Sequence, residues 1–263
     1  MEKIRLKAIW LVVAVLTFIS TAGLWAEEEL KEEIYTPDPA ITAMIASNPV
    51  LIEDKLKASI INEIKNPASV TIDITHISPE DTALGKFKRV FVTVSRGEIE
   101  ECVIDSAKIE FLDVQLNTKR LIEEDKIKPI NKCNINMDVL VKESDLNDFL
   151  ARRAKKIKVD NPKVKMIPGN LELSGSTKYG FVKVEFWAKG NFNIKDKKEI
   201  WFHASKMKVN RISMPRNFVG AIVKKINPVL KFSKFSFNAN VEAINITNGE
   251  MRMTSFPDGH GFE

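Results

Sequence analysis

The stretch VKVEFWAKGNFNI, residues Val182 to Ile194, alternates apolar and polar side chains with a period of two. Successive side chains of a β-strand point to opposite faces, so this period predicts one apolar and one solvated face. At about 3.3 Å per residue the strand spans roughly 40 Å, whereas most strands have about five or six residues. A strand of this length with one dry face indicates a large sheet over an extended apolar surface.

Other segments with the same period lie on both sides of this strand. They are residues 70–76, 90–94, 99–116, 133–141, 164–167, 171–178, 199–212 and 241–253. Three segments with apolar residues at helical spacing interrupt them, beginning near Ser47, Ser144 and Met214. Long strands that follow one another with few helices predict an α+β fold, in which a long curved antiparallel sheet wraps around amphipathic helices. A shift in apolar phase near Leu112 and Asp113 predicts a bulge or bend there.

The first residues resemble a secretory signal. Three basic residues precede an apolar run that ends near Ala22, and acidic residues begin at Glu27. This pattern predicts a signal peptide over residues 1–26 and an exported, periplasmic or otherwise extracytoplasmic protein. The apolar run approaches the length needed to span a bilayer, so an uncleaved N-terminal membrane anchor is the alternative.

The rest of the chain is expected to contain a flexible lead-in over 27–46, a single domain over 47–253 and a loose tail over 254–263. The sequence has 263 residues and 44% hydrophobic content, which is enough for a packed core. Its 40 basic and 35 acidic residues are mixed along the chain. Mixed charge, together with export, argues against nucleic-acid binding.

Residues that carry chemistry are few. The three histidines are widely spaced and do not match a zinc site. Ser174-Gly175-Ser176 is the nearest approach to a nucleophile turn, but it lies within an expected strand and lacks the G-x-S-x-G pattern. We therefore assign no catalytic residue, metal or cofactor, and an esterase is the enzymatic alternative. Cys102 and Cys133 either pair in the exported protein or remain buried thiols.

Five runs occur in a fixed order along the chain. They are LGKFKRVFVTV (Leu84–Val94), ECVIDSAKIEFLDVQL (Glu101–Leu116), ESDLNDFL (Glu143–Leu150), MPRNFVGAIVKKINPVL (Met214–Leu230) and VEAINITNGEMRM (Val241–Met253). In sequence and order they resemble the bacterial LmeA-like phospholipid-binding family, a former domain of unknown function similar to the tubular lipid-binding superfamily. The resemblance covers about Ser47 to Met253. It implies an elongated half-barrel with an apolar groove and no catalytic motif.

A groove of this kind binds its ligand through an apolar lining and does not need a fixed set of polar site residues. Burying a 16-carbon chain contributes on the order of 10 kcal/mol before the costs of binding, at about 0.8 kcal/mol per methylene. We predict the lining from the positions that fall on the apolar face of each expected strand or helix. The predicted lipid-binding residues are Met137, Val139, Phe149, Val184, Phe186, Phe192, Ile194, Phe218, Ile222, Ile226, Phe232 and Phe235.

The expected partner is a phospholipid or an isoprenoid-type membrane lipid, held for envelope lipid transport or homeostasis by a monomer or homodimer. Trp187 falls on the polar face of its strand and Trp201 could face either way, which suggests transient contact with a membrane surface. The same alternation is also typical of an ordinary packed core. The alternative function is therefore a structural or protein-interaction module in envelope assembly, with no ligand.

Overall fold

The computed structural model describes residues 35–99, 101–155, 158–179, 182–215, 217, 219, 227–228, 230–231 and 239–262. The segment predicted as a signal peptide and most of the helix predicted from Met214 lie outside these residues. None of the helices in the described ranges is long and apolar enough to cross a membrane. The chain forms two compact units, and each takes segments from several parts of the sequence. Unit 1 contains Val141–Lys231 and Ile244–Arg252, and unit 2 contains the described residues of Ala26–Leu140, Phe232–Ala243 and Met253–Glu263.

The fold is α+β with antiparallel sheets, as the sequence predicts. The strands form two sheets, with the orders β1-β2-β3-β4-β12-β11 and β10-β8-β7-β6-β5, and β9 pairs with β8. Neither order closes into a barrel among the described strands. The single domain predicted over 47–253 stays a prediction, because both units draw on this range.

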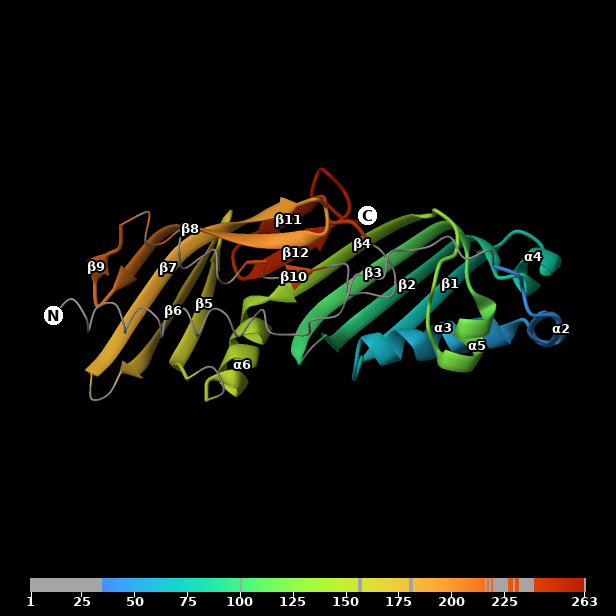
Figure 1. Cartoon of the computed structure of the whole chain (residues 1–263), viewed down its shortest axis with the longest axis horizontal. Helices are drawn as coiled ribbons and strands as arrows, with labels where there is room; N and C mark the ends of the chain where they lie inside the picture. Colours follow the sequence, from blue (N-terminus) through green and yellow to red (C-terminus); the bar gives the residue numbers. More distant parts are fainter. Residues whose placement is uncertain are drawn as a thin grey trace. The chain divides into compact units, whose positions relative to one another are not determined.

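Unit 2 is built on four strands that lie side by side (Figure 1). The strands are β1 (Ser69–His76), β2 (Lys86–Ile99), β3 (Cys102–Gln115) and β4 (Asn134–Lys142), of which β4 runs on into unit 1. The helices of unit 2 are α2 (Pro39–Ser47), α3 (Val50–Glu63), α4 (Pro79–Ala83) and α5 (Thr118–Glu124).

The apolar periods of unit 2 are confirmed by its burial. Val90 and Val92 are buried on β2 and pair with Phe111 and Ile109 of β3. The apolar phase then shifts as the sequence predicts, because Asp113 has left-handed backbone with φ 51°. The predicted spacing of four in α3 is also confirmed, since its inner face is fully buried. This face consists of Ile52, Leu56 and Ile60.

A helix that the sequence analysis did not predict lies within the expected lead-in. In α2 the side chain of Asp38 accepts hydrogen bonds from the amides of Ala40 and Ile41, and Pro39 occupies the first turn. An aspartate cap followed by proline is a strong helix start, because proline needs no donor there. Ile41 and Ile45 are buried by this helix.

The two cysteines lie far apart in unit 2. Cys102 is the first residue of β3, whereas Cys133 directly precedes Asn134, which pairs with Leu112 near the other end of β3. About ten residues of extended strand separate the two positions, or roughly 30 Å. A disulfide needs Cα atoms within about 7 Å, so pairing within one chain is excluded. Neither cysteine forms a disulfide, and burial raises the pKa of the Cys133 thiol.

The chain after β12 contributes aromatic rings to unit 2. The ring centroid of Phe262 lies 4.9 Å from that of Phe256 and 5.1 Å from that of Phe91 on β2, both in edge contact. Edge-to-face pairs of this kind add to the energy of burial. That the tail over 254–263 is loose is a statement about its motion, and it stays a prediction.

Unit 1 contains the stretch with which the sequence analysis began. Its large sheet consists of β5 (Asp160–Ile167), β6 (Asn170–Tyr179), β7 (Val182–Lys195), β8 (Glu199–Val209), β9 (Ile212–Ser213) and β10 (Leu230–Lys231). The other elements of the unit are α6 (Glu143–Arg153), β11 (Ala243–Ile246) and β12 (Glu250–Thr254), and the last two begin or end in unit 2. Ser144, which the sequence predicts as the N-cap of α6, lies instead in the first turn of the helix. Lys142 is the cap, and Glu143 enters the helix while its carboxylate accepts the amide of Met166 at 2.6 Å.

Candidate functional site

The alternation of β7 is confirmed from Lys183 to Ile194, whereas Val182 at the start of the predicted apolar face is exposed. Val184, Phe186 and Ala188 are buried, while Lys183 and Glu185 on the alternate positions are exposed. The strand has 14 residues, so its apolar face is unusually long.

This face belongs to a cluster of buried side chains that we call the apolar cluster. It joins α6 to the inner faces of β5, β6, β7 and β8. Its members are Leu150, Val159, Val164, Met166, Leu171, Leu173, Phe186, Ala188, Phe202, Met207, Val219 and Ile246. Two buried methionines give the cluster side chains that adapt their shape to neighbouring groups.

Two glycines allow the aromatic rings to lie close to the sheet. A Cβ on Gly175 would approach the ends of Val159 and Phe186 to 2.7 and 2.9 Å. A Cβ on Gly190 would meet the Phe202 ring at 2.7 Å and the carbonyl oxygen of His203 still closer. Gly190 lies where the β7–β8 register shifts, so the close approach follows from the local bulge.

Asparagine side chains hold further segments against this sheet. The Asn147 amide on α6 donates to the Val164 carbonyl at 2.9 Å, and its oxygen accepts the Val164 amide at 2.8 Å. Asn227 makes the same pair of bonds with Phe202 on β8, at 2.8 and 2.7 Å. The first pair fixes α6 on β5, so the helix presents Leu150 to the cluster.

Partly buried apolar side chains pack against the cluster, and we call them its rim. The rim residues are Leu146, Phe149, Phe192, Ala204, Met214, Ile244 and Met251. Each of them packs against the cluster and still has surface to offer a ligand. The rings of Phe192 and Phe202 meet edge to face, with centroids 5.8 Å apart. Flat rings and flexible methionines beside a buried core are suited to contact with an acyl chain.

The predicted lining residues are distributed over both units. Phe186 lies in the cluster, and Phe149 and Phe192 lie in its rim. Val184 and Ile194 lie on the apolar face of β7 but belong neither to the apolar cluster nor to its rim.

Met137 and Val139 are buried on β4 in unit 2, where they pair with Ile109 and Ala107 of β3. Neither residue is a member of the apolar cluster. The remaining predicted residues, Phe218, Ile222, Ile226, Phe232 and Phe235, lie outside the described residues. A lipid-lining role for all twelve stays a prediction.

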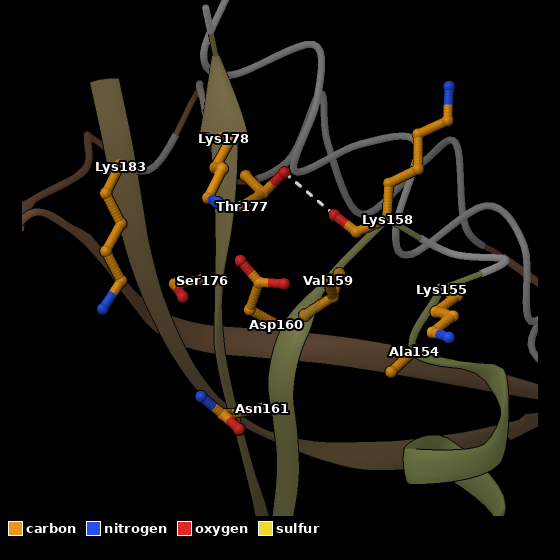
Figure 2. A pocket seen from close by; sticks show the side chains of 10 residues that line it. All are labelled: Ala154, Lys155, Lys158, Val159, Asp160, Asn161, Ser176, Thr177, Lys178 and Lys183. Carbon is orange, nitrogen blue, oxygen red and sulfur yellow. Dashed lines mark hydrogen bonds between the residues drawn. The ribbon is translucent and has the colours of Figure 1, made fainter. Parts of the chain in front are cut away.

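A pocket of about 910 Å³ opens where α6 leads into β5, and we call it the lysine pocket (Figure 2). Its lining residues are Ala154, Lys155, Lys158, Val159, Asp160, Asn161, Ser176, Thr177, Lys178 and Lys183. Sequence reasoning missed this pocket. The available signal was a pair of lysines flanking the expected turn at Tyr179-Gly180, since Lys178 and Lys183 pair directly across β6 and β7.

The other face of the sheet in unit 1 is rich in lysine and carries Trp187 and Trp201. One row across the four long strands reads Lys165, Glu172, Lys189 and Lys206. The next row contains Lys163, Ser174, Trp187 and Lys208. We call these two rows the lysine face.

Trp187 lies on the polar face of β7, as predicted, with the Lys208 ammonium 5.4 Å from its ring. Trp201, for which the sequence left both directions open, lies between buried Ile200 and Phe202 on β8 and so points to the same polar face. Its indole nitrogen donates to Glu199 at 2.8 Å. Both rings are thus held by polar neighbours on this face.

A protein-family model described as LmeA-like phospholipid-binding matches residues 49–256. The chain belongs to the LmeA-like phospholipid-binding family. The match spans most of the 263 residues and includes both units, so it confirms the resemblance that the five sequence runs suggested over about Ser47 to Met253. A search of curated proteins found no match, and a search of solved structures also found none. Where the structure describes this family member, no group of three or more metal-ligating side chains is placed to hold an ion.

Proposed function

We propose that this member of the LmeA-like family is an exported, non-catalytic protein that holds a phospholipid or isoprenoid-type lipid for envelope lipid transport or homeostasis. Membership of a phospholipid-binding family supports lipid binding in general. The observation that carries the more specific proposal is the rim around the apolar cluster. The rim residues pack against the buried apolar cluster and remain partly accessible to solvent. All of them belong to unit 1, so one unit offers an apolar surface next to its core.

An acyl chain laid along this rim gains free energy from each methylene that leaves water, about 0.8 kcal/mol apiece. Part of this gain is lost to the ordering of the chain, so a long chain is needed for tight binding. The rim offers contacts from α6, β7, β8, β11 and β12, which together suit an extended ligand. The proposal requires no reacting group, and export from the cytoplasm would place the protein where lipids must cross water.

Native mass spectrometry of the chain from Glu27 onward, purified gently and extracted in parallel with organic solvent, tests this function. We expect a stoichiometric lipid adduct whose class the extract identifies. A clean protein mass that stays unchanged after incubation with envelope lipids would overturn the proposal. That result would favour the alternative of an envelope assembly module with an ordinary packed core.

We also propose that the lysine face contacts the surface of an anionic bilayer during lipid pick-up or delivery. Its two rows carry five lysines and one glutamate. A lysine near an anionic surface contributes about 1 kcal/mol, and a tryptophan beside it suits the headgroup region. Salt should weaken the contact because the charges are exposed.

Replacing Lys165 and Lys206 by glutamine should weaken binding to vesicles of mixed zwitterionic and anionic phospholipid by roughly tenfold or more. Both side chains are exposed on the lysine face. The matched control is Lys57→Gln with Lys65→Gln, which removes two exposed lysines from unit 2. Co-sedimentation with vesicles measures the effect. Equal losses in the two variants would show that net charge, and not this face, drives the contact.

A further inference from the structure

The lysine pocket carries an excess of positive charge that the described side chains leave largely unneutralised. Four lysines and one aspartate give the lining a formal charge of +3. Within the described ranges, Lys155, Lys158 and Lys178 form no ion pair. Lys183 contacts Glu185 at 3.3 Å, but both side chains are more than half exposed, so this pair is weak. An incoming anion would therefore displace little existing interaction.

The lysines stand on opposite sides of the pocket (Figure 2). Lys178 and Lys183 come from the paired ends of β6 and β7, and Lys155 and Lys158 come from the segment between α6 and β5. The Thr177 hydroxyl donates to the backbone carbonyl of Lys158 at 2.9 Å and ties the two sides together. The pocket is thus a defined feature of the fold rather than a chance gathering of surface charge.

Ser176 adds a hydroxyl donor for a bound oxyanion. Ser176 lines the pocket although only 5% of its surface is exposed. Among the described residues its side chain has no hydrogen-bond partner. A phosphate group would supply the acceptor, and lysine ammonium groups are well suited to phosphate as point charges.

The pocket also adjoins the apolar cluster. Val159 is 2% exposed and belongs both to the pocket lining and to the cluster. Its side chain lies beside Gly175 together with the ring of Phe186, which is at the centre of the apolar face of β7. The charged pocket and the apolar cluster therefore have a lining residue in common. A phospholipid likewise joins a charged headgroup to apolar acyl chains.

We propose that the lysine pocket binds the phosphate group of a phospholipid whose acyl chains lie against the rim of the apolar cluster. This inference rests on the proposed function and names the part of the lipid that unit 1 recognises. A volume of about 910 Å³ is enough for a headgroup. Asp160 places one carboxylate in the same pocket, so a headgroup that carries a hydroxyl or ammonium donor beside a singly charged phosphodiester is favoured.

The test compares three probes by native mass spectrometry titration of the full mature chain. The probes are phosphatidylglycerol, diacylglycerol with the same acyl chains, and glycerol 3-phosphate. For the wild type we expect at least tenfold tighter binding of phosphatidylglycerol than of diacylglycerol. Lys178→Gln with Lys183→Gln should lose at least tenfold in phosphatidylglycerol affinity and leave diacylglycerol affinity unchanged. The same result is expected for Lys155→Gln with Lys158→Gln.

The control is again Lys57→Gln with Lys65→Gln in unit 2, which changes the net charge equally and should keep wild-type affinities. All four pocket lysines are exposed, so these variants should fold, and circular dichroism checks this. Equal wild-type affinity for phosphatidylglycerol and diacylglycerol would overturn the pocket assignment and leave lipid binding intact. Binding of neither lipid would overturn the proposed function as well. Binding of glycerol 3-phosphate as tightly as the phospholipid would replace the lipid by a free phosphate ester.

Asp160→Asn gives an independent check on the choice of headgroup. We expect this variant to gain affinity for phosphatidic acid, whose phosphomonoester carries more negative charge, relative to phosphatidylglycerol. The carboxylate would otherwise repel the second charge. An unchanged ratio would show that Asp160 does not face the bound headgroup and would overturn this part of the assignment.

Discussion

Replacing Gly190 by alanine is expected to destabilise unit 1 by about 1–3 kcal/mol, as overpacking within a core does. A Cβ at this position would overlap the carbonyl oxygen of His203, a backbone atom of the neighbouring strand. It would also meet the Phe202 ring at 2.7 Å. Because β7 and β8 are hydrogen-bonded there, the backbone cannot move away without breaking the register of the pair.

Urea denaturation followed by circular dichroism measures this loss, and Gly175→Ala is the matched control. The added methyl at Gly175 meets only the ends of the Val159 and Phe186 side chains, which are able to shift. We therefore expect a clearly smaller loss for Gly175→Ala. A loss at Gly190 equal to or below the loss at Gly175 would mean that the bulged register relaxes easily.

Replacing Ala204 by phenylalanine is expected to lower lipid affinity by roughly fiftyfold while the protein stays folded. Ala204 is a partly buried rim residue on β8, directly opposite Gly190. A phenyl ring there would occupy space that about three methylenes of an acyl chain fill in the proposed complex. Losing three such contacts costs about 2.4 kcal/mol, which gives the expected factor.

Titration of delipidated protein with a single phospholipid measures this affinity, and His203→Phe is the control. His203 is the neighbouring residue on β8 and points to the exposed polar face. We expect the control to retain wild-type affinity, because the new ring adds bulk away from the rim. If Ala204→Phe binds as tightly as the wild type, the acyl chain lies elsewhere on the molecule.

The parts of the fold that a sequence predicts well are those with a strong local period. The buried face of β7 follows from its alternation, and the buried face of α3 follows from isoleucine and leucine at a spacing of four. The shift at Asp113 was also visible, because it changes which positions are apolar. These features depend on neighbours along the chain, and the α+β class follows from their order.

Features that depend on pairing between distant segments could not be predicted from local periodicity. The lysine pocket exists because β6 and β7 place Lys178 opposite Lys183, while Lys155 and Lys158 come from the chain between α6 and β5. A residue's position on the apolar face of a strand likewise does not show to which unit the strand belongs. Met137 therefore appeared equivalent to the residues of β7, although it is buried in unit 2.

The two asparagines that bind backbone groups of the sheet in unit 1 have a consequence for solubility. β5 ends the strand order of this sheet at one edge. At the other edge, the described strands that pair with β8 besides β7 are β9 and β10, which have two residues each. Exposed strand edges recruit strands from other molecules and so promote aggregation. Asn147 occupies the amide and carbonyl of Val164 at one edge, and Asn227 occupies those of Phe202 at the other. Each side chain thereby blocks the addition of a foreign strand at a place where the sheet would otherwise continue from one molecule to the next.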